Sequence, residues 1–310
     1  MLQEKIIIGE NTNYPLNGIL TLPSDTMRPV PAVVFVHGSG SSNMDEKVGK
    51  LTPFKDLAEG LTKHGIASVR YDKRSFAHGF KMIRDKKHPI TVKEETIEDA
   101  ILATELLRKD SRIDAKNIFI IGHSMGAMLA PRIDAEGGHF RGLILMAGSP
   151  RKLEEIMLGQ NEDMLAQSKG IVRWIMQKQV RKFEKLFEGM YDLSDEEAKK
   201  RKMSGGTTLY YFKEMGEHPA SDYLKRLEKP ILVLQGEKDF QAKVNPDFLG
   251  YQALLAGKSN VTFKLYKNLN HVFVPSVYGS ILQAKKEYNI EQHIGEEVIA
   301  DIAGWILDNE

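Results

Sequence analysis

The chain has no cysteine, and its basic and acidic residues almost cancel. Without cysteine there is no disulfide, thiolate metal site, iron–sulfur cluster or cysteine nucleophile. The 43 lysines and arginines face 42 aspartates and glutamates, for a net charge of +1, so no overall field would hold a polyanion. We therefore expect no nucleic-acid partner and no membrane partner, and a protein compatible with a reducing cytoplasm.

Long apolar runs are missing as well. No segment approaches the ~20 apolar residues that span a bilayer. The first residues, MLQEKIIIGEN, hold one short apolar run that Gly9 and Glu10 interrupt, without the basic start and longer apolar region of a secretory signal. Hydrophobic residues make up 42% and charged residues 27% of the 310, as in globular proteins. A folded, cytoplasmic protein is the expectation.

Short apolar runs recur in the pattern of strands that are covered on both faces. They span residues 32–36, 66–71, 118–121, 143–147, 231–234 and 261–266. Helical patterns lie between several of them, for example at residues 54–64 and 96–107. This alternation predicts an α/β fold with a mostly parallel central sheet flanked by helices. Ahead of it, residues 5–8 and 18–22 predict an antiparallel hairpin.

The alternation stops after Pro150 and resumes near Pro230. Residues 151–228 contain no convincing strand, but large apolar residues recur every three or four positions from Val172 to Met190, as on an amphipathic helix. We therefore expect a core of residues 1–150 and 229–310 with a helical insertion at 151–228. The insertion is either a subdomain packing its own core, or a lid over a site formed by the sheet, or both.

A Gly-x-Ser-x-Gly pattern, Gly122-His-Ser124-Met-Gly126, directly follows the apolar run 118–121 and precedes the helical stretch 127–133. A serine on a tight strand-to-helix turn needs small flanking residues, and the helix start directs its amides toward an oxyanion formed there. This setting favours Ser124 as a nucleophile over a structural turn serine. His123 is expected to pack behind the turn.

A serine nucleophile needs a base, and the base needs an orienting acid. Asp239 follows the strand run 231–234, and His271 follows the run 261–266. Because parallel sheets bind ligands at the carboxyl ends of their strands, the three side chains should converge. Glu237 and Asp247 are rival acids near the same loop.

Gly38-Ser-Gly40 ends the first buried strand, and Asp72 ends the next, an arrangement that also occurs in dinucleotide-binding proteins. However, Asn43 replaces the third glycine, and Pro53 starts the helix too late for a pyrophosphate to meet it. The sequence has no P-loop, EF-hand loop or His-Glu-x-x-His motif, so we expect no cofactor and no metal. The basic stretch 73–87 is interpreted as a solvated loop near the site.

These motifs resemble those of the α/β-hydrolase superfamily, in particular the esterase and acyl-peptidase-like branch that is similar to dienelactone hydrolases and cinnamoyl or feruloyl esterases. The resemblance rests on His37-Gly-Ser-Gly40, Arg70-Tyr-Asp-Lys-Arg74, Gly122-His-Ser-Met-Gly126, Gln235-Gly-Glu-Lys-Asp239 and Asn270-His-Val-Phe273. It implies a Ser124–His271–Asp239 triad and an oxyanion hole made by the backbone N–H groups of Ser39 and Met125. The chain departs from its relatives at Ser75-Phe76, where a glycine is frequent, and at Ala127, where a second glycine is frequent.

The resemblance implies a serine carboxylesterase that cleaves short-chain acyl or aryl esters of small molecules through an acyl-enzyme. A peptidase or thioesterase with the same triad, and a catalytically silent binding protein, are the alternatives. Oligomeric state stays open, a homodimer included. The candidate substrate-binding residues of the helical insertion are Trp174, Met176, Phe183, Phe187, Tyr210 and Tyr211.

Overall fold

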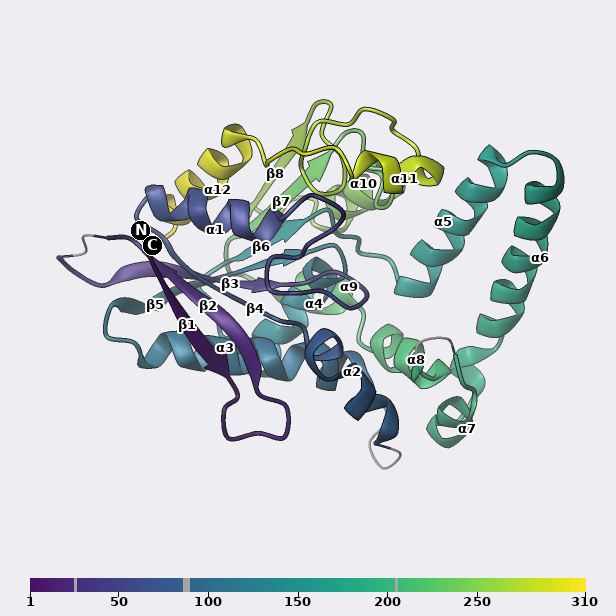
Figure 1. Cartoon of the computed structure of the whole chain (residues 1–310), viewed down its shortest axis with the longest axis horizontal. Coiled ribbons are helices and arrows are strands. Elements are labelled where there is room, and N and C mark those ends of the chain that lie inside the picture. Colours follow the sequence, from purple (N-terminus) through teal and green to yellow (C-terminus); the bar gives the residue numbers. More distant parts are fainter. Residues whose placement is uncertain (25–26, 86–89, 204–205) are drawn as a thin grey trace.

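One sheet runs through the middle of the molecule (Figure 1). The computed structural model describes residues 1–24, 27–85, 90–203 and 206–310, and in these ranges the sheet has eight strands in the order β1-β2-β4-β3-β5-β6-β7-β8. Pairing is antiparallel from β1 through β2 to β4 and parallel elsewhere. The strands are β1 (Leu2–Ile8), β2 (Leu16–Leu22), β3 (Val30–Val36), β4 (Ala67–Tyr71), β5 (Ile113–His123), β6 (Leu143–Met146), β7 (Ile231–Gly236) and β8 (Val261–Tyr266). The predicted parallel sheet and N-terminal hairpin are confirmed.

Helices cover both faces of the sheet (Figure 1). α1 and α12 lie on one face, and α3, α4 and α10 pack on the other. Successive residues of β3 face opposite ways: Val33 and Phe35 join one apolar core, and Val34 and Val36 join the other. The helices of this core are α1 (Pro53–Lys63), α2 (Arg74–Arg84), α3 (Glu98–Lys109), α4 (Met125–Ile133), α10 (Leu249–Leu254), α11 (Ala284–Glu287) and α12 (Glu296–Asp308).

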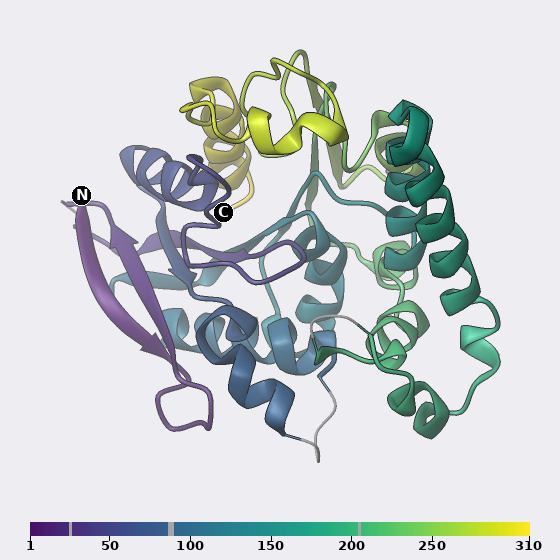
Figure 2. The same ribbon diagram turned by 45° about the vertical axis from the view of Figure 1, so that its right-hand side comes forward.

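A run of helices lies between β6 and β7, and all of it except its last helix forms the right-hand side of Figures 1 and 2. It consists of α5 (Leu153–Gln167), α6 (Gly170–Phe187), the short turn η3 (Met190–Asp192), α7 (Asp195–Lys200), α8 (Leu209–Glu217) and α9 (Ala220–Arg226). We call α5 to α8 the inserted helices. α5 packs along α6, and α9 packs against α4 of the core. None of the helices described is both long and apolar enough to cross a bilayer.

The helix predicted from Val172 to Met190 is shorter than expected. Gly189, at a φ of 66°, breaks the pattern after α6 has ended. Only Val180 of α6 is buried, while Trp174 remains 57% exposed. Val172 and Ile175 are also about half exposed, and Phe183 and Phe187 are partly buried, because α6 packs mainly against α5.

The basic stretch interpreted as a solvated loop is instead the helix α2, as far as it is described; residues 86–89 lie outside the described ranges. Lys73 and Arg74 are buried rather than solvated. The Arg74 Nε donates to Asp99 Oδ2 over 3.0 Å, which satisfies the buried guanidinium. A run of basic residues in the sequence does not show which of them will find buried acidic partners elsewhere in the chain.

Candidate active site

Ser124 occupies a sharp turn between β5 and α4. Its φ of 54° and ψ of −117° are a conformation that residues with a side chain rarely adopt. A Cβ at Gly126 would collide with the Val36 carbonyl oxygen, and one at Gly122 would collide with the Gly126 carbonyl. Both glycines are thus required by close backbone approach, and Ser124 has the strand–turn–helix setting of a nucleophile.

His271 lies in the loop after β8, beside Asp239 in the loop after β7. The His271 Nδ1 is 2.8 Å from the Asp239 Oδ2. Because a carboxylate only accepts hydrogen bonds, Nδ1 carries the hydrogen and donates it, which leaves a lone pair on Nε2. His271 and Ser124 line the same cavity. The structure therefore brings together the three side chains that the sequence singles out.

The Asp239 carboxylate is held in place from several sides. Oδ1 accepts hydrogen bonds from the backbone N–H groups of Gln241 at 2.7 Å and Ala242 at 3.0 Å. Oδ2 accepts one from the Gln235 Nε2 at 2.9 Å, besides that from His271. These donors fix the orientation of the carboxylate and, through it, that of the imidazole.

The rival acids make other contacts. The Glu237 side chain is 41% exposed and lies 3.8 Å from Lys238. Asp247 is buried, but it accepts hydrogen bonds from the Ser149 hydroxyl at 2.6 Å and the Lys243 N–H at 2.7 Å. Of the three acids, Asp239 is the one placed to orient His271.

A buried ion pair lies behind Ser124. The His123 Nδ1 is 3.0 Å from Glu46 Oε2, and the His123 Nε2 hydrogen-bonds the His271 carbonyl at 2.9 Å. Burial lowers the pKa of His123, but the Glu46 carboxylate outweighs burial and raises the pKa overall. Burial raises the pKa of Glu46, and the attraction of His123, together with the hydrogen bond from the Gly38 N–H, more than offsets it, so that pKa is lowered. Both directions favour a charged pair.

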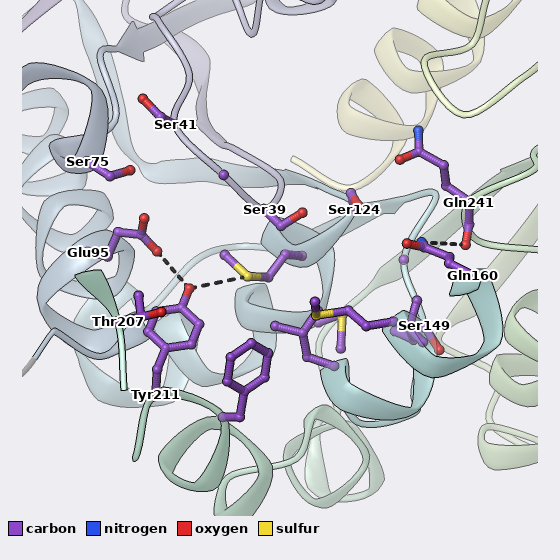
Figure 3. A pocket seen from close by; sticks show the side chains of 18 of the residues that line it. Ser39, Ser41, Ser75, Glu95, Ser124, Ser149, Gln160, Thr207, Tyr211 and Gln241 are labelled. Atoms are coloured by element: carbon purple, nitrogen blue, oxygen red, sulfur yellow. Dashed lines mark hydrogen bonds between the residues drawn. The ribbon is translucent and has the colours of Figure 1, made fainter. Parts of the chain in front are cut away.

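The loop after β3 borders Ser124. The Gly38 N–H donates to Glu46 Oε1 over 2.8 Å, and a Cβ at Gly38 would lie 3.1 Å from that of Ser124. Ser39 and Met125 both line the cavity, and Ser39 can be seen there beside Ser124 in Figure 3. In the part of the chain that the structure describes, neither of their backbone N–H groups donates to another group of the protein. Two amides are thus free to bind a ligand next to Ser124.

The cavity over Ser124 has a volume of about 540 Å³. It lies between the core loops and the inserted helices, with the Tyr211 and Glu95 side chains at one side and Ser124 facing it (Figure 3). The larger apolar side chains of its lining are those of Met82, Ile83, Ile90, Met125, Met128, Leu153, Ile156, Met157 and Phe212. Unbranched methionines let such a wall adapt to ligands of different shape.

Cation ligands do not gather anywhere in the described ranges: no group of three or more His, Asp or Glu residues there could hold a metal ion. The chemistry that the site can perform with its own residues is that of a serine, a histidine and a carboxylate.

A sequence model of the family described as serine aminopeptidase, S33, matches residues 28–274. The chain belongs to this family. The match extends from β3 to the loop of His271, so it includes every residue of the site described above.

This S33 family member is 33% identical over 305 residues to the esterase EstD of Thermotoga maritima. The aligned region covers 96% of this chain and 68% of the relative. Solved structures share its fold. The esterase Pf2001 of Pyrococcus furiosus superposes with a TM-score of 0.58 at 17% identity, over 99% of this chain and 91% of that one. Est1E of Butyrivibrio proteoclasticus with ferulic acid bound gives 0.59 at 15% identity, over 98% of each chain. The predicted α/β-hydrolase fold is confirmed.

The structure narrows the candidates on the inserted helices. Of the six, Tyr211 lines the cavity. Trp174 lies under the Lys178 ammonium in solvent, and Phe183 packs on Phe187. Tyr210, in the first turn of α8, has the Lys199 ammonium over its ring, and neither Tyr210 nor Met176 belongs to the cavity lining. Helical periodicity marks which residues share a face, but not which face meets the cavity.

Sequence reasoning did not single out Lys73, Glu95 or Glu46 as parts of this site. Only the position of Lys73 in the sequence could have indicated a role in the site, because Lys73 follows β4 at the same edge of the sheet as Ser124. Glu95 lies on η1 (Lys93–Ile97), a π-helical turn, which is a feature often found at functional sites. A π-helical turn has no recognisable sequence pattern of its own.

Proposed function

We propose that this S33 family member is a serine carboxylesterase with Ser124 as nucleophile, His271 as base and Asp239 as orienting acid. The single observation that carries the proposal is the 2.8 Å His271–Asp239 hydrogen bond at the cavity that Ser124 lines. The esterase name of the Thermotoga maritima relative supports the same class of reaction.

The chemistry follows from the positions of these groups. The Ser124 hydroxyl attacks the acyl carbon while His271 Nε2 takes its proton, and the imidazolium is stabilised by Asp239. The Ser39 and Met125 amides form the oxyanion hole, each contributing about 3–4 kcal/mol to stabilising the tetrahedral intermediate. The protonated His271 then gives its proton to the leaving alcohol, and water, deprotonated by the same imidazole, hydrolyses the acyl-enzyme.

An ester fits this cavity better than a peptide with a free amino terminus. An aminopeptidase has to bind the ammonium group of its substrate, which calls for a carboxylate that has no other cation. Glu95 is the acid among the described residues that line the cavity, and Lys73 and Tyr211 already engage it. Thioesters remain within reach of the same machinery.

The substrates proposed are small acyl or aryl esters. A largely apolar cavity of about 540 Å³ accommodates such a group beside Ser124. That Est1E binds ferulic acid makes aryl esters a useful part of the substrate panel. We assign residues 151–228 as a cap between the two core parts 1–150 and 229–310, because α5 and α8 supply cavity residues.

A fluorophosphonate probe tests the assignment directly. Covalent labelling of Ser124, lost in Ser124→Ala, is the expected result. A panel of p-nitrophenyl esters of increasing chain length, with aryl cinnamates and aminoacyl anilides alongside, then defines the substrate. Absence of both labelling and turnover would favour a silent binding protein, and faster turnover of anilides than esters would favour a peptidase.

A further inference from the structure

Lys73 carries a buried ammonium group that the reaction scheme does not use. The residue is 1% exposed, and its Nζ donates to the Gly38 carbonyl over 2.9 Å and to the Gly40 carbonyl over 3.1 Å. Its third neighbour is Glu95 Oε2, at 3.5 Å. An ammonium group has three donors, so all of them are directed at this loop and this carboxylate.

The two carbonyls belong to the residues on either side of Ser39, so the bonds from Lys73 affect the orientation of the Ser39 N–H group. The Gly38 carbonyl and the Ser39 N–H belong to one planar trans peptide group, in which they point in opposite directions. A bond from Lys73 to that carbonyl therefore turns the Ser39 N–H away from Lys73, in a loop whose other side borders the cavity. Gly40, at a φ of 84°, leaves the following peptide free to rotate unless something holds it.

Glu95 links Lys73 to the inserted helices. Its Oε2 accepts a hydrogen bond from the Tyr211 hydroxyl over 2.7 Å, and Tyr211 belongs to α8 (Figure 3). The same hydroxyl lies 3.6 Å from the Met125 sulfur. Glu95 and Tyr211 are each 7% exposed, so these contacts are shielded from water.

We propose that Lys73 and Glu95 are positioning residues that orient the Ser39 amide toward the oxyanion, and that Tyr211 couples this orientation to the docking of α8 on the core. The proposal rests on the proposed esterase function. It adds a role for the cap in transition-state binding. An ion pair that served stability alone would need only Glu95, whereas Lys73 also holds the peptide group that carries the Ser39 N–H and the peptide group that follows Gly40.

The test compares Lys73→Met, Glu95→Gln and Tyr211→Phe with the parent enzyme on p-nitrophenyl acetate. A trifluoromethyl ketone, whose serine adduct carries an oxyanion, reports the amide orientation separately from substrate binding. Lys73→Met should lower kcat roughly 10- to 100-fold and weaken the inhibitor by the same factor, with KM nearly unchanged. Tyr211→Phe should lower kcat and the affinity for the inhibitor, each by about threefold to tenfold.

Tyr210→Phe and Glu237→Gln are the controls, since Tyr210 neighbours Tyr211 outside the cavity lining and Glu237 is an exposed carboxyl. Both should leave kcat and inhibitor affinity unchanged. The losses in Tyr211→Phe and Glu95→Gln should also fail to add in the double variant, because the two side chains act in one chain of contacts.

Additive losses, or a lower kcat with unchanged inhibitor affinity, would overturn the proposal. Circular dichroism establishes whether each variant folds. If Lys73→Met does not fold because Glu95 is left unpaired, the double variant Lys73→Met/Glu95→Gln, which lacks both charges, takes its place in the assays. A parent chain without labelling or turnover would overturn the esterase function and this inference together. An active, labelled parent whose variants all bind the inhibitor normally would overturn this inference alone.

Discussion

The imidazole Nδ1 of His123 lies 3.0 Å from the Glu46 carboxylate, in the buried layer behind Ser124. The pair supports both sides of the site, because His123 contacts the His271 carbonyl and Glu46 accepts from the Gly38 N–H. Its charges make that support dependent on pH.

Replacing Glu46 by Gln should destabilise the fold most at mildly acidic pH. The pKa of His123 is raised in the folded state, so the stability it gains is complete below its unfolded value of ~6.5 and is lost as pH rises through the folded value. The pKa of Glu46 is lowered, so its contribution is lost only as pH falls below ~4.5. Burial lowers the pKa of His37 to about 4, so this neighbour stays neutral over the pH range in which Glu46 and His123 are both charged.

Urea unfolding of the parent and Glu46→Gln at pH 6 and pH 9 measures this. We expect a difference in unfolding free energy of about 3 kcal/mol at pH 6 that shrinks by pH 9. Glu237→Gln, at an exposed carboxyl, is the control without such dependence. A difference that grows with pH would contradict the ion pair.

Asp239→Asn should lower kcat by roughly 10⁴-fold, because an amide no longer selects the His271 tautomer that has its lone pair on Nε2. Asp247→Asn should instead lower the unfolding free energy by about 1–3 kcal/mol through its lost contacts with Ser149 and Lys243, with kcat little changed. Steady-state kinetics beside urea unfolding separates the two effects. Glu237→Gln serves as a surface control, and a larger loss there than at Asp239 would reassign the acid.

Gly126→Ala should cost at least about 4 kcal/mol of unfolding free energy, or prevent folding, because its Cβ would collide with the Val36 carbonyl oxygen. Gly304→Ala is the matched control. Gly304 lies within α12 with nothing within 4 Å of an added Cβ, so the change should stabilise the helix by about 0.5–1 kcal/mol. The urea midpoints of the two variants test this prediction. Equal effects would rule out the close approach of the Val36 carbonyl oxygen to Gly126.

Phe212→Leu should enlarge the cavity next to the acyl group. We expect kcat/KM for p-nitrophenyl octanoate, relative to acetate, to rise by roughly tenfold, since Phe212 lines the cavity from α8. Trp174→Ala, at a residue that is 57% exposed on α6, should leave this ratio unchanged. The assay is a comparison of the two esters in each variant. A response to Trp174 instead of Phe212 would place the acyl group elsewhere.

Buried strands and the turn around Ser124 were predictable because each depends on local sequence. Continuous apolar runs mark strands covered on both faces, and Gly122 and Gly126 mark a turn with no room for side chains. The order of Ser124, Asp239 and His271 along the chain then places their loops at one edge of the sheet.

The supporting residues were not predictable in the same way, since burial of an ion depends on partners that are distant in sequence. Lys73 finds Gly38, Gly40 and Glu95, and Glu46 finds His123. The exposure of Trp174 is a similar case. Its helix has an amphipathic pattern, but the tertiary structure gives α6 only a narrow surface to pack against.

The placement of α9 has a consequence for how such chains can vary. β6 and β7 are adjacent and parallel, so the backbone leaves one edge of the sheet after Met146 and must cross to the opposite edge to begin again at Ile231. α9, packed on α4, is the part of that crossover that lies against the core and leads into β7. We therefore expect that the sheet can close without the helices α5 to α8. On this interpretation they are an exchangeable module, whose replacement reshapes the ligand space while strand register and the Ser124 turn stay as they are.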